Sequence, residues 1–229
     1  MGSHTERSQG MDGVESRISP VGFDREYSRR NFLKTAAIAG AAAAAGAGGL
    51  AFAARPAFAV HEGYQAAGPL AILQLAYKLE LLEGTFYAEG INAGIFAGNS
   101  FAETQIAAIR DAEMTHADAL AAAIVDNGGS VPATPMFTFP DGVFADPAAF
   151  LNLAATFEPV GIGAYQGAAP ALIGSPLLGS ALSIHNAECQ HWNAIKILNG
   201  VVPPNNVIFE EALPLEAVLE AVAPFGVTA

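Results

Sequence analysis

Two short motifs carry the most specific chemistry in this sequence. Glu113-x-x-His116 and Glu188-x-x-His191 each place a carboxylate three residues before an imidazole. On an α-helix this spacing puts both side chains on one face, about one turn apart. Iron and manganese accept carboxylate and imidazole ligands. The motifs therefore predict a metal site between two helices.

The pairing is more frequent than composition explains. Residues 60–229 contain 12 glutamates and 4 histidines, which gives roughly 0.3 such pairs by chance. The alternative interpretation is a pair of solvated helix faces. It is disfavoured because isoleucine, alanine and leucine surround both motifs at helical spacing.

Four amphipathic helices are expected to position these motifs. Their predicted ranges are about 69–93, 101–127, 147–171 and 176–199. The start signals are Pro69, a capping box of Ser100 with Glu103, Asp146-Pro147 and Ser175-Pro176. Two C-terminal stops are predicted at Asn127-Gly128-Gly129 and Asn199-Gly200.

The connections between these helices predict an all-α bundle. The segment 128–145 is rich in proline and glycine and long enough to cross over between the second and third helices. A short fifth helix is expected to start at Pro214.

Each of the four helices carries an apolar stripe that charge interrupts near its middle. Glu80 and Glu83 interrupt the first stripe, Glu158 the third, and the two Glu-x-x-His motifs the other two. Buried charge is costly unless it is paired or bound to a metal, so the shared interruption predicts one common site. Glutamates on two helices and Glu-x-x-His on the other two are typical of dinuclear carboxylate bundles.

The predicted site has an internal repeat. Glu188 follows Glu113 by 75 residues and Glu158 follows Glu80 by 78, which indicates a duplicated helix pair. Four carboxylates would balance two divalent ions. Glu113 and Glu188 are the best candidates to bridge the ions, because each shares its helix with a histidine. Glu80 and Glu158 would be terminal ligands.

Two segments carry a family resemblance: Leu79–Tyr87, which reads LELLEGTFY, and Phe157–Tyr165, which reads FEPVGIGAY. With the Glu-x-x-His motifs, they resemble the ferritin-like superfamily, in particular its exported branch that includes desiccation-related proteins. The resemblance implies a ferritin-like four-helix bundle and a tyrosine seven residues after the ligand glutamate, here Tyr87 and Tyr165. The implied metal ligands are Glu80, Glu113, His116, Glu158, Glu188 and His191.

Two residues leave alternatives open at this site. Glu83 has Gly161 as its counterpart in the other half, so it has no symmetric partner. It is an extra carboxylate, a proton relay or a substitute ligand. Pro159 directly follows Glu158, and proline inside a helix kinks it. The third helix is therefore either bent at the site, or Glu158 is displaced from coordination.

Three functions fit this reading. A di-iron or di-manganese site could act oxidatively on metal or peroxide, with O2 or peroxide as the small oxidant. The alternative is a desiccation- or stress-related protective protein without catalytic turnover. Iron storage in a shell ranks lowest, because the sequence gives no sign of cage contacts. A homo-oligomer stays open. The net charge of −12 argues against nucleic-acid binding.

The N-terminus has the layout of an export signal. Ser-Arg-Arg-Asn-Phe-Leu-Lys at 28–34 precedes an apolar run from Thr35 to Ala54 and a small-x-small pattern that ends at Ala59. The paired arginines resemble a twin-arginine signal. Residues 1–59 are predicted to be a disordered start plus signal peptide, and residues 60–229 the bundle domain. Export into the periplasm or out of the cell by the twin-arginine machinery follows. A retained membrane anchor is the alternative.

Overall fold

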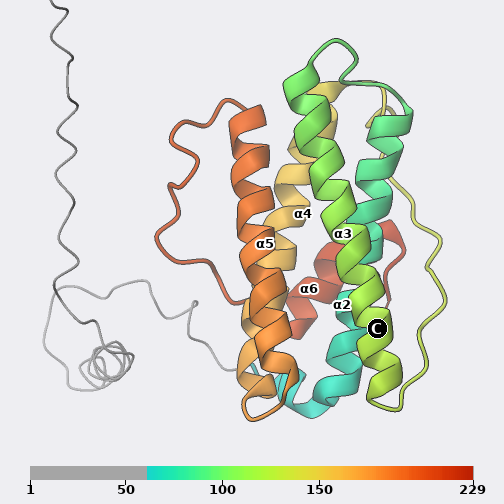
Figure 1. Ribbon diagram of the computed structural model, residues 1–229, viewed down its shortest axis with the longest axis vertical. Coiled ribbons are helices and arrows are strands. Elements are labelled where there is room, and N and C mark those ends of the chain that lie inside the picture. The colour runs from blue at the N-terminus through green and yellow to red at the C-terminus, as the bar shows by residue number, and fades with distance from the viewer. Residues whose placement is uncertain (1–60, 229) are drawn as a thin grey trace, which may run out of the picture. The chain divides into compact units, whose positions relative to one another are not determined.

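The computed structural model describes residues 61–228, and these residues form helices and connecting loops without a strand (Figure 1). The elements are α2 (Glu62–Asn92), α3 (Ser100–Asp126), α4 (Pro147–Ala168), η2 (Ala169–Leu172), α5 (Leu177–Leu198), α6 (Leu215–Val222) and η3 (Ala223–Phe225). None of these helices is long and apolar enough to cross a membrane. The predicted signal segment, 1–59, lies outside the described residues.

The topology is the predicted four-helix bundle with a crossover. α2 packs along α3, and α4 packs along α5. In Figure 1 the loop after α3 runs the full length of the bundle before α4 begins, so α3 and α4 run in the same direction. α6 is the predicted short C-terminal helix and packs against α4 and α2.

The helix ends follow the predicted signals at most positions. The Asp146 carboxylate accepts hydrogen bonds from the backbone N–H groups of Ala148 and Ala149, which caps α4. Gly128 and Gly200 follow α3 and α5 with φ of +75° and +76°, which glycine adopts without a Cβ clash. The predicted capping box at Ser100 is wrong. Asn99 is the cap, and its side chain accepts from the Ala102 N–H.

The first helix begins earlier than predicted. α2 starts at Glu62, not Pro69, but Gly68 interrupts it with φ of +77°. Pro69 therefore opens the long continuous part of α2, as predicted, and residues 62–67 add a segment before the break. α4 ends at Ala168, and a 3₁₀ turn completes the predicted range.

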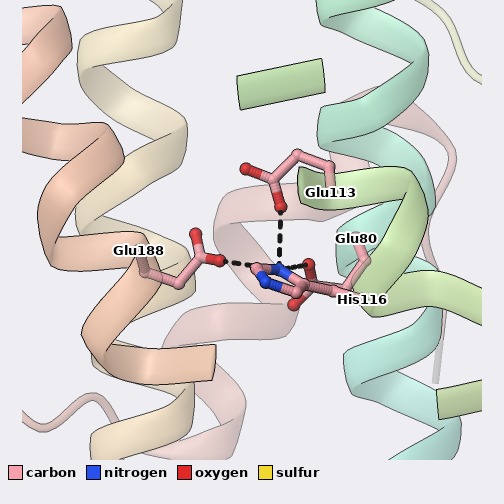
Figure 2. Close-up of side chains that lie close together, drawn as sticks. All are labelled: Glu80, Glu113, His116 and Glu188. Carbon is pink, nitrogen blue, oxygen red and sulfur yellow. Dashed lines mark hydrogen bonds and ion pairs between the residues drawn. The ribbon is translucent and has the colours of Figure 1, made fainter. Parts of the chain in front are cut away.

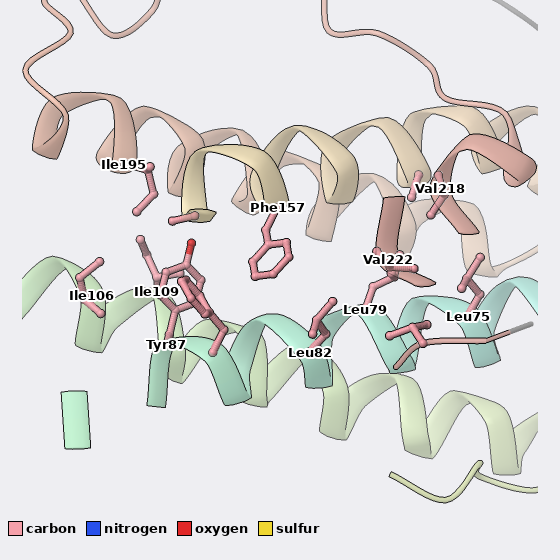
Figure 3. Packing of buried hydrophobic residues seen from close by; sticks show 14 of the residues in the cluster. Leu75, Leu79, Leu82, Tyr87, Ile106, Ile109, Phe157, Ile195, Val218 and Val222 are labelled. Carbon is pink, nitrogen blue, oxygen red and sulfur yellow. The ribbon is translucent and has the colours of Figure 1, made fainter. Parts of the chain in front are cut away.

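Two hydrophobic clusters flank the centre of the bundle. The aromatic cluster has the buried rings Phe86, Tyr87, Phe96, Phe150 and Phe157, which belong to the larger core shown in part in Figure 3. The aliphatic cluster consists of Leu73, Ala76, Leu120, Ile124, Tyr165 and Ile184. On α2 and α4, which carry members of both clusters, the two clusters lie on opposite sides of the mid-length glutamate along the chain. A polar layer therefore separates two apolar ends.

Candidate metal centre

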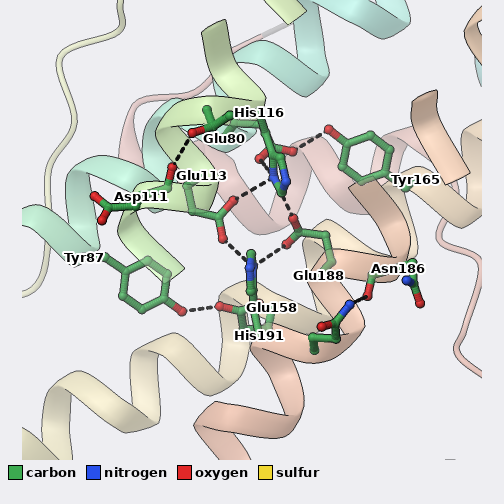
Figure 4. Close-up of polar contacts among 12 residues, drawn as sticks. Glu80, Tyr87, Asp111, Glu113, His116, Glu158, Tyr165, Asn186, Glu188 and His191 are labelled. Carbon is green, nitrogen blue, oxygen red and sulfur yellow. Dashed lines mark hydrogen bonds and ion pairs between the residues drawn. The ribbon is translucent and has the colours of Figure 1, made fainter. Parts of the chain in front are cut away.

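The four long helices bring six acidic and imidazole side chains into one buried layer. One group that could hold an ion is Glu80, Glu113, His116 and Glu188, and a second is Glu113, Glu158, Glu188 and His191. In each group one ligand atom per residue lies within 4.8 Å of the others. Glu113 and Glu188 belong to both groups. The structure therefore brings together all six predicted residues, with the two expected bridging glutamates between the two groups (Figure 4).

The first group is centred on His116 (Figure 2). Its Nδ1 lies 3.0 Å from Oε2 of Glu80, 3.4 Å from Oε1 of Glu188 and 3.6 Å from Oε2 of Glu113. Three helices thus aim carboxylate oxygens at one imidazole nitrogen. The His116 side chain is 15% exposed, whereas Glu80 is 1% exposed. This group is therefore reached from solvent on its histidine side.

The second group repeats the first around His191. Its Nδ1 lies 2.7 Å from Oε1 of Glu113 and 3.8 Å from Oε2 of Glu188. The side chain is 10% exposed. The two imidazole rings stack with centroids 6.0 Å apart. The pseudo-twofold arrangement predicted from the repeat is present in the positions of these side chains.

Several ligand atoms of the layer lack hydrogen-bond partners among the described residues. They are both carboxylate oxygens of Glu113 and of Glu188, Oε2 of Glu158 and Nδ1 of His191. Buried polar atoms are normally hydrogen-bonded, because an unpaired one costs about 1–3 kcal/mol. Oxygens and nitrogens that converge at ion-pair distances without well-formed hydrogen bonds fit a shared cation. The residues present therefore fit divalent metal ions, and their role as ligands stays a prediction.

Two tyrosines hold the terminal glutamates in a crosswise pattern. The Tyr87 hydroxyl on α2 donates to Oε1 of Glu158 on α4, and the Tyr165 hydroxyl on α4 donates to Oε1 of Glu80 on α2. Burial raises the pKa of both tyrosines well above the usual range, so each stays a neutral donor. Each tyrosine therefore orients the glutamate of the opposite helix.

Glu83 lies against the centre without belonging to either group. It is 4% exposed, and a Cβ placed on Gly161 would be 3.3 Å from Oε1 of Glu83 and 3.4 Å from Oε2 of Glu188. The missing side chain at Gly161 thus makes room for the Glu83 carboxyl. Burial, then the charges of Glu188, Glu158 and Glu80, raise the pKa of Glu83 well above its ordinary range. Burial and these neighbouring charges therefore favour the neutral form of Glu83 in the metal-free layer.

Without metal, the imidazoles would supply the balancing charge. Burial lowers the pKa of His116, but hydrogen bonds to Glu113, Glu188 and Glu80 outweigh it and raise the pKa to about 11. Burial likewise opposes ionisation of Glu188, yet its bonds to both histidines leave its pKa lowered. Burial, followed by the charge of Glu188, raises the pKa of Glu158 to about 8. The metal-free layer is therefore a proton-balanced network.

The structure decides the question raised by Pro159. α4 continues through this residue to Ala168, and Glu158 is 0% exposed and part of the second group. Glu158 therefore lies within the second group despite the proline that follows it, and its coordination of a metal stays a prediction. The other histidine of α5, His185, forms a hydrogen bond with Gln166 and belongs to neither group.

The sequence did not predict two features of the centre. The crosswise tyrosine pairing has no local signal, because Tyr87 and Glu158 are 71 residues apart. The position of the Glu83 carboxyl in the space that a side chain at Gly161 would occupy was signalled only by the broken symmetry between the two halves.

Comparison with known families places this bundle in a class of proteins. A family profile described as a ferritin-like domain matches residues 68–200, which include all four long helices from Gly68 to Gly200 and the six clustered side chains. The chain belongs to the ferritin-like domain family. A search of curated proteins gave no significant match.

Proposed function

We propose that this ferritin-like protein binds two divalent ions, iron or manganese, and acts oxidatively on metal or peroxide. The observation that carries the proposal is the pair of ligand groups that share Glu113 and Glu188. Shared carboxylates at the centre and one histidine in each group are what a dinuclear site needs. A dinuclear iron or manganese centre would supply redox chemistry toward O2 or peroxide.

The protein's own residues have distinct tasks in this proposal. Glu113 and Glu188 would bridge, while Glu80 with His116 and Glu158 with His191 would hold one ion each. Tyr87 and Tyr165 fix the terminal carboxylates through their hydrogen bonds. The apolar clusters above and below the layer exclude water and strengthen electrostatic interactions inside it.

Metal stoichiometry tests the proposal. The natively produced protein should contain about two ions per chain, as expected for a dinuclear site. His116→Ala or His191→Ala should each remove about one ion, whereas Glu113→Ala should disturb both. His185→Ala is the matched control, because this histidine lies on α5 outside both groups. Full metal content in the Glu113→Ala variant would overturn the assignment.

The oxidative role has a separate test. The metal-loaded protein should consume peroxide, or oxidise Fe(II) in the presence of O2, and His191→Ala should lose this activity. A protein that binds two ions and shows neither reaction would overturn the oxidative proposal and favour the protective one.

We also propose export by the twin-arginine route, which rests on the Arg29-Arg30 pair and the small-x-small pattern before Val60. N-terminal sequencing of exported protein should begin at Val60. The Arg29→Lys, Arg30→Lys double variant should stay in the cytoplasm. Normal export of that variant would overturn the proposal.

A further inference from the structure

A cavity of about 120 Å³ adjoins the polar layer in the aliphatic half of the bundle. Protein interiors pack like organic crystals, with few voids larger than a water molecule, whose share of liquid volume is about 30 Å³. A space several times that size is therefore not a packing defect of the usual kind.

Small side chains create the cavity. All four long helices contribute alanines to its wall: Ala76, Ala119, Ala123, Ala164, Ala168 and Ala181. The remaining lining is mainly leucine and isoleucine, with Tyr64, Tyr165 and Ser180 as the hydroxyl-bearing residues. A trapped water needs two to four polar partners, which this wall offers poorly. The lining favours an apolar occupant.

The inner end of the cavity lies close to the polar layer. Ala76 lies four residues before Glu80, Ile184 four before Glu188, and Leu120 four after His116. Four residues span about one helical turn, or roughly 5–6 Å. Tyr165 lines the cavity and also donates to Glu80. The inner end of the cavity is therefore separated from the ligand groups by about one layer of side chains.

The cavity also has a route to solvent. Ala119 on α3 and Ser180 on α5 line it and are exposed at the surface. Their small size leaves the seam between these two helices open. The cavity wall also contains the buried Tyr64, whose hydroxyl has no hydrogen-bond partner among the described residues.

We propose that this cavity binds a compact, apolar organic molecule, about the size of a monocyclic aromatic, beside the metal layer. An apolar cavity of roughly 150 Å³ holds a benzene ring. The cavity here, at about 120 Å³, is of similar size and is lined by small side chains where it meets the surface. Its position, about one layer of side chains from the ligand groups, makes this molecule a neighbour of the proposed metal centre, and that step rests on the proposed function. The binding itself does not depend on metal.

Toluene is a direct probe of the cavity. The full-length protein, metal-free and metal-loaded, should bind toluene at one site by calorimetry or by ligand-observed NMR. Ala123→Leu places extra carbon atoms in the cavity and should weaken the affinity at least about tenfold. Ala122→Leu is the matched control, because Ala122 is the exposed neighbour on α3 and does not line the cavity. It should bind as the parent does.

A second filling variant guards against misfolding. Ala181→Val, on α5, should also weaken toluene binding, and helical circular dichroism should match the parent for every variant compared. The cavity proposal would be overturned if the parent did not bind toluene. It would also be overturned if both filling variants bound toluene with the affinity of the parent. Toluene binding with no metal uptake would instead leave the cavity standing and overturn the proposed metal function, so the two failures are distinguishable.

Discussion

The two ends of the bundle solve the same packing problem differently. In the aromatic cluster, Phe86 stacks on Phe150 with centroids 4.2 Å apart, and other rings pack edge-on around them. In the aliphatic half, alanines from every long helix leave a cavity. Each end nevertheless supplies one tyrosine to the polar layer, Tyr87 from the first and Tyr165 from the second. The aromatic end is therefore tightly packed, whereas the alanines of the aliphatic end leave space that a ligand could fill.

The largest expected effect comes from the layer that separates the two ends. In the metal-free protein, the Glu158 pKa of about 8 exceeds its ordinary 4.5, and the His116 pKa of about 11 exceeds 6.5. Groups with raised pKa values contribute stability below the unfolded pKa and lose it as the pH rises through the folded one. Metal-free stability should therefore fall from about pH 4.5 upward, because protons are what balance the layer.

Metal should reverse this trend, because ligands bind in their deprotonated forms. The melting temperature measured with chelator should fall between about pH 5 and about pH 9, and the gain on adding Mn(II) or Fe(II) should grow over that range. Glu188, whose pKa is lowered, opposes the trend only in acid. Melting temperatures equal with and without metal at every pH would contradict this expectation.

Truncation of a buried ring in the aromatic cluster should lower the free energy of unfolding more than truncation of a side chain that lines the cavity. Phe150→Ala removes a ring that is 0% exposed and should destabilise the fold by about 3–5 kcal/mol. Leu120→Ala enlarges an existing cavity, so fewer contacts are lost, and the cost should be near the low end of about 2–5 kcal/mol. Urea denaturation of both variants measures the difference. Equal costs would mean that the two ends are packed alike.

The two tyrosines should have matching effects on metal and different effects on the cavity. Tyr87→Phe and Tyr165→Phe each remove one hydrogen bond to a terminal glutamate. Each should lower the affinity for one of the two ions by about 10–100-fold. Competitive chelator titration measures this, with Tyr77→Phe on the same helix as the control. Only Tyr165→Phe should also change toluene affinity. A change in toluene affinity in Tyr87→Phe would contradict the assignment of the cavity to the aliphatic half alone.

Two glycine substitutions should give the smallest effects, with opposite signs. A Cβ at Gly90 would lie 2.3 Å from Cε2 of Phe150, so Gly90→Ala should destabilise by about 1–3 kcal/mol through overpacking. At Gly179, near the start of α5, no atom lies within 4 Å of such a Cβ. Gly179→Ala should therefore stabilise by about 0.4–1 kcal/mol. Thermal denaturation checks both signs, and a stabilising Gly90→Ala would contradict the tight packing.

Local sequence was sufficient for much of the fold. The helices could be located because apolar stripes and turn residues act over a few positions, as at Asp146-Pro147 and Gly128. The cap at Asn99 was misassigned because Asn99 and Ser100 are adjacent good caps, and the backbone geometry selects between them. The segment before Gly68 was missed because Pro69 looks like the first residue of a helix. The sequence does not show that helical residues also precede the break at Gly68.

By itself, the sequence determined which side chains could meet. Glu80, Glu113, His116, Glu158, Glu188 and His191 lie at helical spacing on apolar faces, and burying them separately would be too costly. Only the tertiary structure decided how they meet. It pairs each tyrosine with the glutamate of the opposite helix, seats Glu83 against Gly161, and leaves the alanine-lined cavity beside the layer. The physical reason is that periodicity acts within one helix, whereas these contacts depend on how four helices are packed against one another.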